Sequence, residues 1–88
     1  MVYKPAFHPN VAKDLKSLDK STRQRILNKM QWLLEHVEDV RHEPLTAQWE
    51  GTYRLRVGDY RVIYTVDQTE MRVIIYAVGH RREIYKLR

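Results

Sequence analysis

Two stretches in the first half of the chain carry apolar residues at the spacing of an α-helix. The members of the first stripe are Val11, Ala12, Leu15 and Leu18. The members of the second, longer stripe are Ile26, Leu27, Met30, Leu33, Leu34 and Val37. Pro9 or Asn10 starts the first helix, and Asp19 or Ser21 caps the second. The pattern predicts two antiparallel helices that form a hairpin.

Residues typical of β-strands surround this helical pair. Residues 2–8 favour a strand, but Pro5 restricts it to the edge of a sheet. After a predicted loop over residues 41–50, further strands are expected at 52–57, 60–66 and 71–78, with turns at Gly58-Asp59 and 67–70. The tail leaves the sheet at Gly79. We therefore predict one α+β domain over residues 1–88, in the order β-α-α-β-β-β. It consists of an N-terminal strand, the two-helix hairpin and a three-stranded antiparallel meander, with both helices packed on one sheet face.

The hairpin at Gly58 allows its register to be counted from the sequence. Glycine at the first central position of a two-residue turn favours a type II′ turn, which sets Val57 opposite Tyr60 and Arg56 opposite Arg61. Residues that face each other across strands share a face, so two surfaces separate. One surface is apolar and suits the helical stripes; it consists of Tyr53, Leu55, Val57, Tyr60, Val62 and Tyr64. The other surface carries Arg54, Arg56 and Arg61.

The next turn extends the arginine surface. If Val66 lies opposite Met71, Arg61 lies beside Tyr76 and Ile63 beside Ile74, so Tyr76 joins the arginines. Like charges directly opposed across strands are destabilising, and some interaction must offset them. Either Asp59, Glu70 or Glu83 pairs with the arginines, or the surface is a binding site for the phosphates and bases of single-stranded nucleic acid.

Composition narrows the possible partners and sites. The net charge is +5, and residues 51–88 hold eight Lys/Arg, seven of them arginine, against four Asp/Glu. This excess favours an anionic partner, and arginine's planar fork suits phosphate. The chain has no cysteine, and its histidines lack metal-site spacing, so we expect no disulfide, metal or cofactor. Because no segment is typical of a secretory signal or a membrane span, a cytoplasmic protein with no membrane contact is expected.

Three segments together resemble the RelE/ParE superfamily of bacterial toxin–antitoxin toxins, and in particular its RelE-type mRNA endonucleases. They are FHPNVAKDLKSLDKSTRQRI, LTAQWEGTYRLRVGDYRVIY and VIIYAVGHRREIY, in the order and spacing of that superfamily. The resemblance implies a ribosome-dependent endoribonuclease that inhibits translation. Such an enzyme cleaves messenger RNA in the ribosomal A site without a metal, by attack of a ribose 2′-hydroxyl on the adjacent phosphorus. It also implies a cognate antitoxin, through which alone the protein contacts operator DNA.

The resemblance also implies roles for individual residues. Arg61 corresponds to the arginine that contacts the scissile phosphate, and Arg81 to one that stabilises or protonates the leaving group. Tyr85 corresponds to a tyrosine that orients or activates the nucleophile and stacks on a base. Arg54 and Arg56 stand where the best-known RelE pattern has lysines. Arginine stays protonated and is a poor base, so the general base is either Tyr85 or His80.

Two alternatives to this interpretation stay open. ParE-type members act on DNA gyrase, do not cut RNA and share much of the hairpin signature, so the arginines could be a scaffold or contact surface. A simple basic RNA-binding domain is the third possibility. In the nuclease interpretation, Arg82 and Tyr76 join Arg54 and Arg56 as RNA-binding residues.

Overall fold

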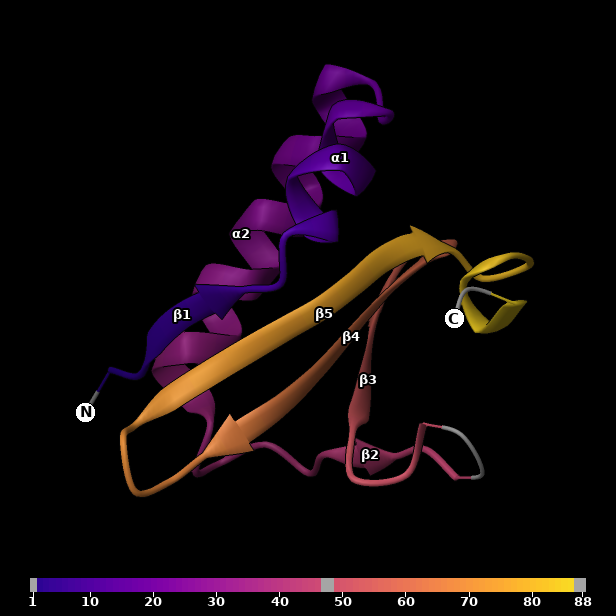
Figure 1. The fold of residues 1–88 in the computed structure, drawn as a ribbon. Helices are drawn as coiled ribbons and strands as arrows, with labels where there is room; N and C mark the ends of the chain where they lie inside the picture. The colour runs from indigo at the N-terminus through magenta and orange to yellow at the C-terminus, as the bar shows by residue number, and fades with distance from the viewer. Residues whose placement is uncertain (1, 47–48, 87–88) are drawn as a thin grey trace.

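The computed structural model describes residues 2–46 and 49–86, which form one mixed sheet with two helices. The strands are β1 (Lys4–Phe7), β2 (Glu43–Pro44), β3 (Tyr53–Val57), β4 (Tyr60–Asp67) and β5 (Arg72–His80). Their spatial order is β1-β5-β4-β3-β2, with β1 parallel to β5 and the other neighbours antiparallel. Helices α1 (Asn10–Lys16) and α2 (Lys20–His36) lie on one side of this sheet (Figure 1). The predicted α+β fold is confirmed.

Helix α2 begins where the sequence indicated. Asp19 is its N-cap, and one carboxylate oxygen accepts a hydrogen bond from the backbone N–H of Thr22 at 3.1 Å. The hydroxyl and the amide of Thr22 both donate to this carboxylate, and they lower the pKa of Asp19. The predicted apolar stripe packs against the sheet through Ile26, Met30, Leu33 and Leu34, all buried. Leu27, at 36% exposure, lies at the margin of that stripe.

The hairpin between β3 and β4 has the predicted turn and register. Gly58, the first central residue of the turn, has a positive φ of 59°, whereas the φ of Asp59, the second, is not positive. A type II′ turn requires this combination. Arg56 pairs with Arg61 and Val57 with Tyr60, as counted from the turn. The expected apolar members of this hairpin face the helices and join the main core.

The expected register between β4 and β5 is wrong. Arg61 lies opposite Gly79 and Ile63 opposite Ala77, whereas Asp67 pairs with Arg72 at the other end. Two features explain the difference. The turn at 68–71 closes later than expected, with Met71 at a φ of 53°, and Tyr76 is an extra residue between the partners of Ile63 and Tyr64. Such a bulge places the consecutive residues Tyr76 and Ala77 on one face. The expectation that the tail leaves the sheet at Gly79 is also wrong, because β5 continues to His80, which pairs with Tyr60.

Both edges of the sheet add to the sequence-based description. β1 is an edge strand, as Pro5 indicated, and it pairs in parallel with β5. On the opposite edge, part of the predicted loop forms the two-residue strand β2, in which Glu43 pairs with Arg54 and Pro44 with Tyr53. A proline is tolerated there because β2 is an edge strand of the sheet. Glu43 thereby reaches the arginine-bearing strand.

A second, smaller core covers part of the sheet face that is turned away from the helices. Ile63, Ala77 and Ile84 form its buried centre, and its margin consists of Leu45, Trp49, Tyr76 and Tyr85. Ile84 belongs to the short 3₁₀ helix η2 (Ile84–Lys86), which follows β5. A Cβ atom added to Gly79 would lie 3.1 Å from Ile84 Cδ1, so the missing side chain at Gly79 lets Ile84 sit against the sheet. The tail is thereby fixed on this face.

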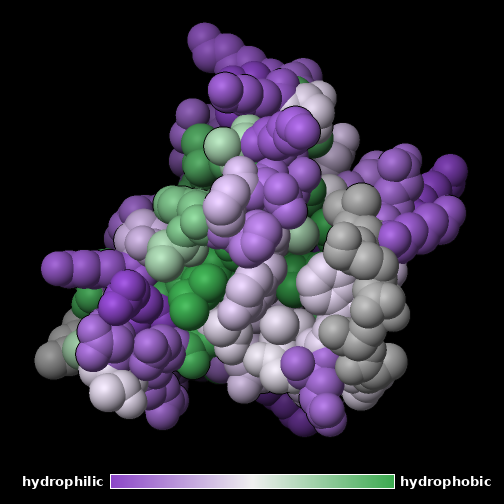
Figure 2. Space-filling view, in the orientation of Figure 1, coloured by the Kyte–Doolittle hydropathy of each residue, from purple (hydrophilic) through white to green (hydrophobic). Residues whose placement is uncertain are grey.

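The described surface is mixed in polarity. Among the large apolar side chains that stay exposed are Val2 at 59% and Phe7 at 52%, both near β1. Figure 2 shows an apolar band through the centre of the viewed face, flanked by hydrophilic side chains. No helix in the described ranges is long and apolar enough to cross a membrane. Nor do the described residues bring together three or more His, Cys, Asp or Glu side chains that could hold a metal ion.

Candidate functional site

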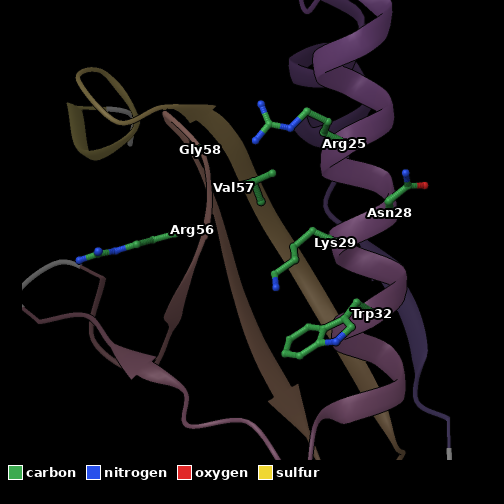
Figure 3. Close-up of a pocket in the computed structure, with 7 residues that line it drawn as sticks. All are labelled: Arg25, Asn28, Lys29, Trp32, Arg56, Val57 and Gly58. Carbon is green, nitrogen blue, oxygen red and sulfur yellow. The ribbon is translucent and has the colours of Figure 1, made fainter.

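The three hairpin arginines lie on the sheet face opposite the helices. Arg54 and Arg56 alternate with Leu55 and Val57, which are buried under the helices, so the arginines take the other face. Figure 3 shows the same division: Val57 is directed toward α2, and Arg56 points away from that helix. Because Arg61 lies opposite Arg56, it shares this face. We call the sheet face that carries Arg54, Arg56 and Arg61 the arginine face.

One carboxylate, Glu43 on β2, contacts two of these arginines. Arg54 Nε donates to Glu43 Oε2 at 3.0 Å, and Arg56 Nε lies 4.0 Å from Glu43 Oε1. The sequence had suggested other carboxylates. Of those, Asp59 contacts Arg81 and Glu70 contacts Arg72. Glu43 was missed because its position depends on a two-residue strand that contains a proline, which leaves almost no periodic signal.

Tyr85 lies beside Arg54. The tyrosine oxygen first, and then the Glu43 carboxylate, raise the pKa of Arg54 above its ordinary value. The Tyr85 hydroxyl is buried, its polar neighbour is the Arg54 guanidinium, and no described residue makes a well-formed hydrogen bond to it. A buried hydroxyl without a partner is uncommon, and it leaves Tyr85 a donor or acceptor for a ligand.

Arg61 and Arg81 both contact the hairpin turn. Arg61 Nη1 donates to the carbonyl oxygens of Gly58 at 2.9 Å and Tyr60 at 2.8 Å. The backbone N–H of Arg81 donates to the Asp59 carbonyl at 2.8 Å, and Arg81 Nε lies 3.7 Å from the Asp59 carboxylate. Within the described residues, no carboxylate lies within ion-pair distance of Arg61. Its positive charge is therefore held in place by backbone carbonyls and stays available to an anion.

The other predicted site residues are less closely grouped. Tyr76 lies on the arginine face within the small core, but the bulge separates it from Arg61. His80 lies opposite Tyr60, with ring centroids 5.4 Å apart, and Tyr60 packs against the main core. His80 is therefore on the helix-packed side, at the end of its strand. Its Nδ1 accepts a hydrogen bond from the backbone N–H of Arg82 at 3.2 Å, and the Arg82 side chain is exposed.

A second cationic region lies between α2 and the end of β3. It is an open groove of about 420 Å³ whose lining includes Arg25, Lys29 and Trp32 (Figure 3). Lys29 Nζ lies 3.8 Å from the centroid of the Trp32 ring, and His36 stacks on that ring at 4.6 Å. Stacking on a base needs a free ring face, and Trp32 already uses its ring within α2. Arg56 also lines this groove, so the groove adjoins the arginine face.

Comparison with known proteins identifies the family. Residues 6–85 match the family model described as "ParE toxin of type II toxin-antitoxin system, parDE". The chain belongs to the RelE/ParE toxin superfamily. Two toxins of Mycobacterium tuberculosis named RelG and RelE share 39% and 38% identity with this chain over 44 and 45 residues, half of the chain. These matches span only about half the length of either relative, 51% and 46%.

Solved structures of RelE/ParE toxins match over nearly the whole chain. The toxin–antitoxin complex RelBE2 of M. tuberculosis matches with a TM-score of 0.82 and 27% identity, over 92% of this chain and 93% of that one. The archaeal RelE–RelB complex of Pyrococcus horikoshii matches with a TM-score of 0.71 and 35% identity, over 92% and 97%. Isolated Escherichia coli RelE, at 22% identity and a TM-score of 0.74, shows the shared fold.

Proposed function

We propose that this RelE/ParE toxin is a RelE-type, ribosome-dependent endoribonuclease that cleaves messenger RNA in the A site. The observation that carries the proposal is the arginine face, where Arg54, Arg56 and Arg61 share one side of the hairpin and Glu43 contacts only Arg54 and Arg56. Arg61 in particular has a guanidinium bound to carbonyl oxygens. Preorganised cations of this kind stabilise the negative charge that a phosphorane gathers more than they stabilise the ground state.

The proposed reaction needs no metal. The ribose 2′-oxygen loses its proton to a base and attacks the adjacent phosphorus. The bond from phosphorus to the 5′-oxygen breaks, which leaves a 2′,3′-cyclic phosphate and a 5′-hydroxyl once the leaving oxygen is protonated. In this scheme Arg61 contacts the scissile phosphate and Arg81 stabilises the leaving oxygen. Arg54 and Arg56 add positive charge to the same face.

We assign Tyr85 the role of orienting or activating the attacking ribose 2′-hydroxyl. Its buried hydroxyl lies beside Arg54 without another partner in the described chain, which suits a group that orients a ribose hydroxyl. His80 stays the alternative base, but its place opposite Tyr60 on the other side of the sheet favours Tyr85. Tyr76 and Arg82 are proposed RNA contacts on the margin of the site.

An antitoxin is the proposed protein partner. The related toxins of M. tuberculosis and P. horikoshii were crystallised as complexes with antitoxins. On this chain, an apolar groove of about 210 Å³ beside the edge strand β1 is lined by Phe7, Leu27 and Met30 among others. It suits an antitoxin segment that docks as a helix or adds a strand at the edge of β1. We propose that bound antitoxin covers or distorts the arginine face.

A second candidate function is gyrase binding without RNA cleavage. The match of residues 6–85 to a family model described as ParE toxin favours it. In that case the arginines form a contact surface, and Tyr85 has no chemical role.

Primer extension on messenger RNA from cells that express the protein tests whether the function is RNA cleavage or gyrase binding. We expect cuts in phase with codons in translated transcripts, and a loss of cleavage of about 10²- to 10³-fold for Arg61→Ala. Arg72→Ala is the matched control, because Arg72 is also a strand arginine but pairs with Glu70 at the other end of the sheet. Intact transcripts together with DNA damage would favour gyrase binding. Cleavage that survives both Arg61→Ala and Arg81→Ala would exclude the proposed chemistry.

A further inference from the structure

Glu43 presents its two carboxylate oxygens to two different arginines of the arginine face. Oε2 accepts from Arg54 Nε at 3.0 Å, and Oε1 lies 4.0 Å from Arg56 Nε. Two non-bridging phosphate oxygens would offer the same pair of guanidinium groups an equivalent set of acceptors. Glu43 thus occupies the position that the arginines would otherwise offer to a phosphate.

The backbone directs Glu43 to this place, while its side chain is free to leave it. Glu43 pairs with Arg54 across β2 and β3, so both side chains leave the sheet on the same face. The side chains of Glu43, Arg54 and Arg56 are 46%, 34% and 63% exposed. An ion pair in such contact with water is weak, and the carboxylate can rotate into solvent without any change in strand pairing.

We propose that Glu43 is a built-in competitor of the RNA phosphate for Arg54 and Arg56. The proposal rests on the proposed function, because it assigns RNA to the same arginines. Without RNA, Glu43 neutralises one charge and offsets the repulsion between Arg56 and Arg61, which face each other across the hairpin. RNA binding must displace the carboxylate, so Glu43 lowers the affinity for RNA and keeps the empty face ordered.

The substitution Glu43→Gln tests this role, because it removes the charge and keeps the size and the strand pairing. Two probes are used, without ribosomes. Inorganic phosphate is titrated while the Nε–H signals of Arg54 and Arg56 are followed by NMR. A single-stranded RNA with 2′-deoxy sugars, which cannot be cleaved by 2′-attack, is titrated at several salt concentrations. We expect both probes to bind the Glu43→Gln variant about two- to fivefold more tightly than they bind the unsubstituted protein.

The salt dependence separates competition from a structural role. Each additional phosphate that the protein neutralises should steepen the slope of log K against log salt by about 0.7 for a single strand. Glu70→Gln is the matched control: it has the same change in net charge and breaks an ion pair of 3.1 Å with Arg72, at 56% and 48% exposure. Arg72 lies opposite Asp67, six positions along β4 from Arg61 and so about 20 Å away. Glu70→Gln should leave the salt slope unchanged.

Glu43→Gln binding that is no tighter than that of Glu70→Gln would overturn the proposal. So would weaker binding with a lowered unfolding midpoint, which would show that Glu43 only holds the strands together. Failure of the nuclease proposal has a different signature. In that case transcripts stay intact in cells, while the phosphate titration on Arg54 and Arg56 still reports whether Glu43 competes.

Discussion

The two faces of this one sheet are built in contrasting ways. Toward the helices, the sheet presents an apolar layer whose fully buried members include Val62, Tyr64, Val73 and Ile75, and α2 packs Ile26 and Leu33 against it. On the other face, the buried centre is limited to Ile63, Ala77 and Ile84 among the described residues, and the remaining area near the hairpin is cationic. Both faces use the same strands, because successive residues alternate between them.

The contrast separates stability from function. Burial of apolar area stabilises the fold at roughly 25 cal/mol per Å², and most of that area lies between the helices and the sheet. The arginine face instead opposes Arg56 to Arg61 and leaves the Tyr85 hydroxyl without a partner in the described residues, both of which cost stability. Such costs are typical of sites that wait for a ligand.

The largest expected effect is on the helix-packed face. Leu33→Ala removes a fully buried side chain and should lower the free energy of unfolding by about 3 to 5 kcal/mol. Leu27→Ala, on the same helix at 36% exposure, is the control and should cost about 1 kcal/mol. Urea unfolding measures both values. Equal costs would mean that α2 does not hold the main core through this stripe.

A smaller effect is expected for the core of the arginine face. Ile84→Ala should cost about 2 kcal/mol, at the low end for such changes, because the small cluster can relax toward the surface. The tail should open locally before the sheet unfolds. Hydrogen exchange should therefore speed up at residues 81–86 more than in β4. Protection that falls equally everywhere would show that both faces form one cooperative unit.

The smallest effect is on the pH dependence of stability. Burial first, and then the charges of Tyr53 and Glu43, raise the pKa of Tyr64. In the unfolded chain Tyr64 ionises near its ordinary value of about 10. Above that pH the unfolded state binds fewer protons than the folded state, so stability should fall as pH rises. Urea midpoints between pH 8 and 11 should fall less steeply for Tyr64→Phe. Parallel curves would contradict the assignment.

Features with a local cause could be predicted from the sequence. Gly58 specified a type II′ turn, and counting from it placed Arg56 opposite Arg61 and separated the two faces. The stripe of α2 identified the helix-packed face, because the period of an apolar stripe depends only on the helix itself.

Features that depend on non-local geometry could not be predicted. The bulge at Tyr76 changes which residues face Arg61, and no residue near it indicates an extra position. Glu43 reaches Arg54 through a two-residue strand, which is too short for a periodic signal. The place of Tyr85 follows from Ile84 docking against Gly79, a contact between side chain and sheet that spacing along the chain does not reveal.

The parallel pairing of the first strand with the last has a consequence for biosynthesis. Lys4 pairs with Arg72, 68 positions later, and β5 lies between β1 and β4. A nascent chain can form its helices early, but the sheet cannot close before residues 72–80 are translated. The tail that carries Arg81 and Tyr85 follows only after that strand. Under the proposed function, the growing polypeptide therefore has no complete catalytic surface until synthesis reaches these residues.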